Sequence, residues 1–226
     1  MELRSDRLLA KLRGEGEAIL AAIDADPLLV KRTSGELVLA NASQALYTPQ
    51  AEHQLFAKGI VYRRDPYRLV SLPLVKIYNL GERDVTVPDL VSIASEQDVR
   101  LSFLRKMDGS LIQVFRHGGR AWFTTRGLLE GARWKWGEED EGRAAEFDYV
   151  AEARRMAEQR YPAVIENEEL LEGRTLLFEL IHPRARKVTN YGELADLVLL
   201  TVFDHRRHRF TSTTTRRPPR RGAHET

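Results

Sequence analysis

Cysteine is absent from the 226-residue sequence. Its absence excludes a disulfide-stapled secreted scaffold, a thiolate metal site and a cysteine nucleophile. Long apolar runs are lacking too, since no window reaches the ~18 uncharged apolar residues that a membrane span needs. Residues 1–13 carry charges every few positions and contain no apolar segment of the kind that marks a secretory signal. Together these absences predict a soluble cytoplasmic protein with no membrane partner.

The net charge of +2 conceals an uneven distribution. Residues 205–226 contain seven Arg, no Lys and one acid, so their formal charge is +6 and the rest of the chain carries −4. Residues 211–221 consist of Thr, Ser, Arg and Pro, with almost nothing to bury, and we predict a disordered basic tail over 204–226. Two explanations of this tail stay open: it binds RNA phosphates through counterion release, or it results from a truncated or frameshifted reading frame.

Hydrophobic spacing predicts an amphipathic helix over residues 5–25, interrupted by Gly14 and Gly16, and a second helix over 143–160. The Gly118-Gly119 pair predicts a two-residue hairpin turn. Short runs rich in β-branched, aromatic and leucine residues predict strands at 59–62, 68–72, 99–106, 111–117, 120–126, 175–181 and 197–203. The predicted class is therefore α+β on antiparallel sheet, with an N-terminal helical segment (1–49), a core (50–203) and the tail.

The segment with the clearest chemical potential is Lys106-Met107-Asp108-Gly109. At the end of a strand, the two-residue period would place Lys106 and Asp108 on one face, and Gly109 would permit a turn that a Cβ opposes. A lysine held against a pocket can act as a nucleophile, here toward the α-phosphorus of a nucleoside triphosphate. The alternative is an exposed β-turn with Asp-Gly at its corner.

The surrounding segments give this motif a context. In chain order they are KGIVY (58–62), RLVSLP (68–73), KIYNLGE (76–82), the motif itself, TRG (125–127), LFEL (177–180) and RKVTNY (186–191). This set resembles the nucleotidyltransferase domain of phage-type ATP-dependent RNA ligases, over about residues 50–203. The resemblance implies an ATP-grasp-like ligase adenylation fold, ATP and Mg²⁺ as cofactors, and RNA as the partner, with repair of broken tRNA as the expected role.

The resemblance also implies roles for matching residues. Lys106 corresponds to the lysine that becomes covalently adenylylated, with Asp108 and Gly109 completing its motif. Glu179 corresponds to the acid that binds the ribose hydroxyls of ATP, and Tyr78 to the ring that stacks on adenine. From the residues alone, Tyr78 could equally be an ordinary half-buried aromatic.

Three cations complete the implied ATP site. Lys76 is the lysine just before the stacking aromatic, although it could merely snorkel beside that ring. Arg126 stands where the family has a lysine on the triphosphate, and Lys58 stands where it has an arginine. Both exchanges keep the charge but alter the geometry of phosphate binding, and both residues could instead be plain surface charges. No metal ligand is identified.

Two motifs of the family are missing after Glu179. No Glu-Gly pair follows that residue and no lysine follows Lys187, whereas the family has a Glu-Gly strand and a terminal lysine pair. Losing one contact to the transferring phosphate often costs a factor of ~10² to 10³ in rate. We therefore expect a C-terminally incomplete domain with impaired ligase activity. The alternatives are an inactive nucleotide- or RNA-binding remnant and a partner chain that supplies the missing half.

Overall fold

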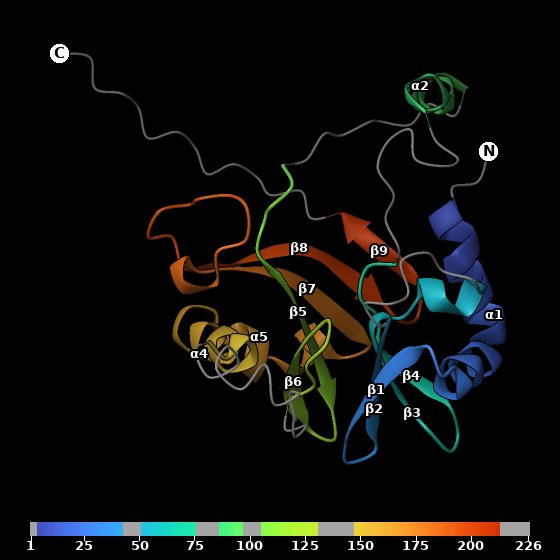
Figure 1. Cartoon of the computed structure of the whole chain (residues 1–226), viewed down its shortest axis with the longest axis horizontal. Coiled ribbons are helices and arrows are strands. Elements are labelled where there is room, and N and C mark those ends of the chain that lie inside the picture. The colour runs from blue at the N-terminus through green and yellow to red at the C-terminus, as the bar shows by residue number, and fades with distance from the viewer. Residues whose placement is uncertain (1–3, 43–50, 76–85, 97–104, 131–146, 213–226) are drawn as a thin grey trace.

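A computed structural model describes residues 4–42, 51–75, 86–96, 105–130 and 147–212 (Figure 1). Its strands form two antiparallel sheets, with the orders β1-β2-β3-β4 and β6-β5-β7-β8-β9. The mixed helix and antiparallel-sheet architecture agrees with the predicted α+β class. The strands are β1 (Leu29–Ser34), β2 (Leu37–Ala42), β3 (Lys58–Arg63), β4 (Arg68–Ser71), β5 (Ser110–His117), β6 (Arg120–Thr125), β7 (Arg174–Ile181), β8 (Asp196–Asp204) and β9 (Arg209–Ser212). The helices are α1 (Arg4–Ala25), η1 (Glu52–Leu55), α2 (Val87–Glu96), α4 (Tyr149–Arg160), α5 (Ala163–Glu166), α6 (Glu168–Leu171) and η3 (Pro183–Ala185).

Helix α1 confirms the amphipathic helix predicted from the spacing of its leucines and isoleucines. Its apolar side chains are buried against the four-stranded sheet in one cluster with residues of β1, β2 and β3. The helix is kinked at Glu15, whose φ of −124° and ψ of 23° are not helical. Gly14 and Gly16 flank this residue, and glycine carries a higher conformational entropy cost in a helix than other non-proline residues. The predicted interruption is therefore a bend and not an end.

The prediction that residues 1–49 form only a helical segment is wrong. Residues 29–42 form the β1–β2 hairpin, whose turn contains Gly35 with a φ of 58°. Strand β2 is buried along nearly its whole length, because it lies between β1 and β3 and packs on both faces. A strand of this kind shows a continuous apolar run instead of the alternation by which half-buried strands are recognised.

The β5–β6 hairpin confirms the predicted Gly118-Gly119 turn. Both glycines have positive φ angles, 58° and 78°, as a hairpin with this pair requires. The alternating residues of β5 divide between the faces of the five-stranded sheet. Ile112 and Val114 pack with helix α4, whereas Phe115 packs with residues of β2 and β3. The five-stranded sheet thus lies between helices on one face and the four-stranded sheet on the other.

Buried polar groups also join the two sheets. The side chain of Gln113 on β5 donates to the Gly59 carbonyl at 2.7 Å and accepts from the Ser71 hydroxyl at 2.7 Å. Thr175 on β7 donates its hydroxyl to Ser71 at 3.2 Å. Buried polar side chains are costly without partners, so these bonds fix how the sheets face each other.

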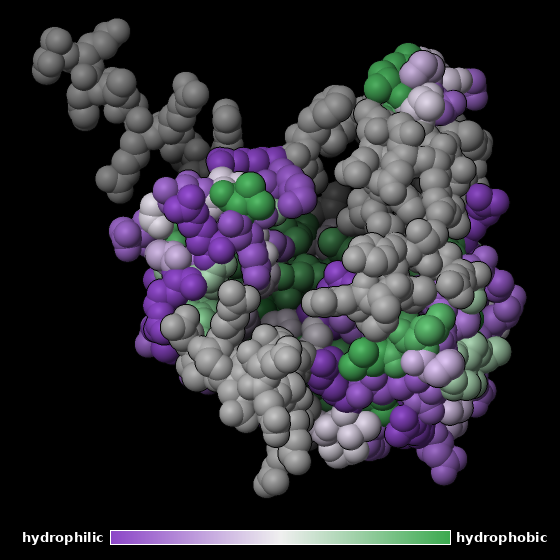
Figure 2. Space-filling model, in the orientation of Figure 1, coloured by the Kyte–Doolittle hydropathy of each residue, from purple (hydrophilic) through white to green (hydrophobic). Residues whose placement is uncertain are grey.

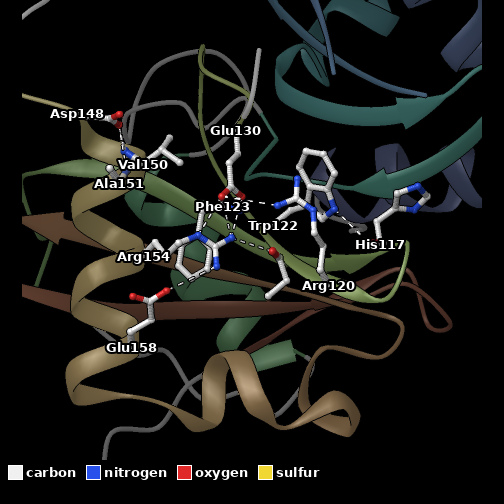
Figure 3. A network of polar contacts seen from close by, with 11 residues as sticks. His117, Arg120, Trp122, Phe123, Glu130, Asp148, Val150, Ala151, Arg154 and Glu158 are labelled. Atoms are coloured by element: carbon white, nitrogen blue, oxygen red, sulfur yellow. Dashed lines mark hydrogen bonds and ion pairs between the residues drawn. The ribbon is translucent and has the colours of Figure 1, made fainter. Parts of the chain in front are cut away.

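Helix α4 is clamped to the edge strand β6 by an ion pair (Figure 3). Arg154 donates to both carboxylate oxygens of Glu130 at 2.9 Å and to the Ala121 carbonyl at 2.9 Å. Glu130 in turn accepts from the Phe123 amide at 3.1 Å, which satisfies an outward-facing donor of the edge strand. The helix starts at Tyr149, later than predicted, and residues 143–146 of the prediction lie outside the described residues.

The prediction of a disordered tail is wrong for residues 204–212, and residues 213–226 lie outside the described residues. Strand β8 extends to Asp204, a turn follows, and β9 pairs with β8 in antiparallel register. Phe203 is fully buried, and Phe210 of β9 packs against it with ring centroids 5.1 Å apart. These two aromatic residues supply the buried surface that composition alone did not reveal. None of the helices in the described part of the chain has both the length and the apolar character that a membrane span requires.

Candidate active site

The Lys106-x-Asp-Gly motif lies directly before β5, and residues 105–108 have no regular secondary structure. The predicted strand over 99–106 is therefore wrong at its last two residues, and 97–104 lie outside the described residues. The alternation of a strand does not orient Lys106 and Asp108. Hydrogen bonds to segments more than 60 residues away orient this loop instead.

Strand pairing brings Glu179 beside the motif. In the β5–β7 register, Ser110 pairs with Leu180 and Leu111 with Glu179. The Gly109 amide, one residue earlier, donates to Oε1 of Glu179 at 2.7 Å. The bond joins two residues that are 70 positions apart in the chain. The family resemblance implies that both belong to the ATP site.

Only glycine fits at position 109. A Cβ there would lie 2.3 Å from the Leu180 carbonyl oxygen and 3.1 Å from Cγ of Glu179. The first distance is far below van der Waals contact, and the obstacle is backbone of the paired strand. The glycine of the motif is thus explained by close approach to β7 and not by a left-handed turn.

Asp108 ties the motif to the loop that follows β7. Its Oδ2 accepts from the Val188 amide at 2.8 Å and from the Thr189 amide at 2.6 Å. Its own amide donates to the Tyr191 hydroxyl at 2.9 Å. The Thr189 and Val188 amides, with a smaller contribution from the charge of Lys106, lower the pKa of Asp108. The carboxylate is therefore ionised at neutral pH and held by two backbone amides, and the Tyr191 hydroxyl fixes the backbone of the same residue.

Glu179 is half-buried at the end of β7. Burial raises its pKa, and the Gly109 amide and the charge of Lys106 partly offset this effect. The charge of Asp108 raises it further. A carboxyl group with one oxygen bound to an amide keeps the other oxygen available for a hydroxyl donor.

Lys106 is exposed, yet its charge interacts with both Asp108 and Glu179. Beside it is a hollow of about 300 Å³ that is lined by Asp108, Gly109 and residues between 181 and 194. Figure 2 shows apolar side chains on the floor of a depression at the centre of this face of the molecule, at the place where β7 and β8 lie side by side in Figure 1. Lys106 and Glu179 thus belong to one electrostatic neighbourhood, with open space next to it.

A second group of site residues lies where the two sheets meet. Arg126 donates from Nε to Oδ1 of Asn41 at 2.8 Å, and Asn41 is paired with Lys58 across β2 and β3. A guanidinium nitrogen of Arg32 lies close to the same place, 3.9 Å from where a Cβ of Gly127 would be. The structure therefore brings the predicted pair Lys58 and Arg126 together and adds Arg32 to them.

The two groups share one face of the five-stranded sheet. Residues directly opposite in an antiparallel pair point to the same side, so Glu179 lies on the side of Leu111 and Gln113, toward the four-stranded sheet. Arg126 follows the last paired residue of β6, Thr125, which lies opposite Ile112. Arg126 and Glu179 are therefore about two strand spacings apart, ~10 Å. Carboxylates and cations converge on the same side.

Sequence reasoning missed part of this site. Asn41 and Arg32 fell in a segment interpreted as helical, and only the β2–β3 pairing reveals their place. Tyr191 was in a segment singled out by resemblance, but its bond to Asp108 had no local signal. Lys76 and Tyr78 lie outside the described residues, so their predicted roles stay predictions. In the described ranges no three His, Asp or Glu side chains are grouped to hold a metal ion.

Comparison with protein families bears on this arrangement. A family model described as RNA ligase matches residues 56–217, which is most of the chain. The chain belongs to the phage-type RNA ligase family. The match includes Lys58, the Lys106-x-Asp-Gly motif, Arg126 and Glu179, the residues that the fold brings together. A search of curated proteins found no match to this chain.

Proposed function

We propose that this RNA ligase family member joins RNA ends with ATP, through an AMP group carried on Lys106. The observation that supports this proposal best is the bond between the Gly109 amide and Glu179. It holds the lysine-bearing loop against a half-buried carboxyl group, which is the pairing that a nucleotide-binding lysine motif needs.

Three transfers make up the proposed reaction. The unprotonated amine of Lys106 attacks the α-phosphorus of ATP, a phosphorus–nitrogen bond forms, and pyrophosphate leaves. The AMP group then passes to the 5′-phosphate of an RNA, which restores the lysine and creates a 5′–5′ pyrophosphate linkage. Finally the 3′-hydroxyl of the other end attacks the RNA phosphate, and AMP leaves. Positioning and charge neutralisation dominate the catalysis of such transfers.

The remaining site residues have roles that follow from their chemistry. The free oxygen of Glu179 accepts from a ribose hydroxyl. Arg126, Lys58 and Arg32 bind the triphosphate, whose negative charge offsets the cost of gathering cations at one place. The Asn41 contact orients the Arg126 fork, since the Nε bond leaves the terminal nitrogens to donate.

A magnesium ion fits the carboxyl groups present. Mg²⁺ usually binds one or two carboxylates together with substrate phosphates and does not need a full protein cage. Asp108 and Glu179 are close enough for their charges to interact. The ion would neutralise phosphate charge during each transfer, and Asp108 is the candidate to hold it, because the free oxygen of Glu179 is assigned to the ribose hydroxyl.

The deciding experiment is incubation of the full chain with α-labelled ATP and Mg²⁺, followed by a search for label on the protein. We expect acid-labile, base-stable label that disappears in Lys106→Ala and persists in Lys11→Ala, since Lys11 is a partly exposed lysine on α1 that pairs with Glu52 outside the site. The labelled protein should then join a 5′-phosphorylated single strand or a nicked tRNA. Label that survives in Lys106→Ala would refute the assignment.

A second function is favoured by the exposure of Lys106. In this case the chain binds a nucleotide or RNA without turnover. The same experiment separates the two, because the binding function predicts thermal stabilisation by ATP in the absence of any label.

A further inference from the structure

A second hollow, of about 370 Å³, lies far from the lysine motif. It is formed by the kinked part of α1, the start of β4 and the turn between β8 and β9. Its floor is apolar, with the buried side chains of Leu12 and Leu20 and the partly buried Leu69. The half-buried ring of Tyr67 forms part of its wall. A hollow of this volume and lining accommodates a flat ring of the size of a nucleobase.

The rim of this hollow is cationic. Arg13 from α1 and Arg68 from β4 are exposed there, and neither makes an ion pair with an acid in the described part of the chain. Glu17 is the acid among the lining residues. Because the guanidinium group matches the geometry of phosphate oxygens, these two arginines are suited to bind a phosphate at the edge of the hollow.

The turn after β8 adds to this character. His208 lines the hollow, and burial, followed by the charge of Arg13, lowers its pKa. The imidazole is therefore neutral at pH 7, and it lines the hollow without adding positive charge. Arg207 and Arg209 flank it and are exposed, so the positive potential extends beyond the rim.

The two hollows lie near opposite ends of β7. The first is lined by Ile181, the last residue of the strand. At the other end Gly173, just before the strand, accepts from the His205 amide at 2.9 Å, within the turn that carries His208. Eight residues at ~3.3 Å each separate these ends by ~25 Å. At ~3.4 Å per phosphate along a stacked strand, on the order of seven nucleotides would span this distance.

We infer that the second hollow is an RNA subsite that takes one unpaired nucleotide of the strand being joined, with its base against Tyr67 and Leu69 and its phosphate on Arg13 and Arg68. The inference rests on the proposed function, since it assumes an RNA substrate. Proteins that bind single strands combine an aromatic platform for a base with cations along the backbone, and this hollow has both. It would hold the RNA at a distance from the transferring phosphate and so contribute affinity without chemistry.

The test is binding of a fluorescent, 5′-phosphorylated 12-nucleotide single-stranded RNA to the full chain across a salt series. Losing two phosphate contacts should reduce the steepness of the negative slope of log K against log salt by ~1.4, at ~0.7 per contact for single strands. We therefore expect this decrease in Arg13→Gln/Arg68→Gln and not in the matched double variant Arg7→Gln/Arg120→Gln. Arg7 and Arg120 are exposed and lie outside the hollow.

The aromatic wall has its own pair of variants. Tyr67 donates its hydroxyl to Asp24 at 3.1 Å, so Tyr67→Phe removes that bond and keeps the ring, whereas Tyr67→Leu removes the ring. RNA affinity should fall about tenfold in Tyr67→Leu and stay within twofold in Tyr67→Phe. Thermal melts of both verify the fold, and label from ATP on Lys106 should be unchanged in every variant.

The outcomes separate the two proposals. RNA binding by the wild type with an unchanged salt slope in Arg13→Gln/Arg68→Gln overturns the subsite and leaves the ligase proposal standing. Equal losses in Tyr67→Phe and Tyr67→Leu overturn the stacking role. Absence of both RNA binding and ATP label in the wild type overturns the proposed function and the subsite with it.

Discussion

Gly109 is the position at which one added methyl group probes the candidate active site most directly. In Gly109→Ala the new Cβ would lie 2.3 Å from the Leu180 carbonyl oxygen, so the start of β5 must move away from β7 by about 1 Å to restore contact. That movement breaks the 2.7 Å bond from the Gly109 amide to Glu179. Overpacking costs ~1–3 kcal/mol, and a lost hydrogen bond to a charged group costs ~1.5–3 kcal/mol.

We expect the free energy of unfolding to fall by ~3 kcal/mol in Gly109→Ala, allowing for partial relaxation. For a chain of this size each kcal/mol lowers Tm by ~2–4 °C, so the midpoint should drop by about 10 °C in a circular dichroism melt. The matched control is Gly14→Ala, because a Cβ at Gly14 would have nothing within 4 Å and alanine favours helix. Its Tm should be unchanged or higher.

The same variant tests the link from packing to chemistry. Label from ATP on Lys106 should fall at least a hundredfold in Gly109→Ala at a temperature where the variant is still folded, because the motif is displaced from Glu179. A Tm within 2 °C of wild type together with full labelling would refute the reasoning that close approach to β7 explains this glycine.

Two further predictions concern stability. Burial lowers the pKa of His205 from 6.5 to about 4, with a smaller contribution from the charge of His208. The native state therefore binds fewer protons than the unfolded state between these two pH values. The contribution of His205 to the free energy of unfolding is fully present above pH 6.5, and it declines by up to ~3 kcal/mol as the pH falls to 4. Urea unfolding at pH 4.5 and 7.5 should show this decline, and His205→Gln should reduce it, whereas an equal decline in both proteins would contradict the assignment. Arg154→Met should cost ~2 kcal/mol because the carboxylate of Glu130 loses both bonds from Arg154 and keeps only the Phe123 amide and the more distant Arg120. Adding Glu130→Gln should recover about 1 kcal/mol in a double-mutant cycle, and simple additivity of the two changes would show that the clamp is not coupled.

The identities of many site residues could be predicted from the sequence, but their contacts in space could not. Lys106, Asp108, Gly109 and Glu179 were named from their motifs, and the structure brings all four together. The loop conformation at Lys106 and the bonds from Asp108 to the amides of residues 188 and 189 were not predictable, because they join segments 80 positions apart and carry no local pattern.

The fold divides in the same way. The kinked helix α1, the Gly118-Gly119 hairpin and the strands of the five-stranded sheet through β8 have signals within a few residues of themselves. Strands β1, β2 and β9 have no such local signal. Strand β2 is buried on both faces, and β9 follows a polar turn. The prediction of the tail from its composition failed at Phe210. The ring of this residue packs against the buried Phe203, and β9 continues the sheet there.

By itself, the sequence determined which residues could do chemistry and which short segments would be helix or strand, because these properties depend on side-chain type and on periods of two to four residues. Only the tertiary structure decided that Glu179 meets Gly109, that Arg32 joins Lys58 and Arg126, and that a second hollow opens beside the α1 kink. These juxtapositions depend on strand register and on how two sheets pack, which are set by burial summed over the whole core and not by any one segment.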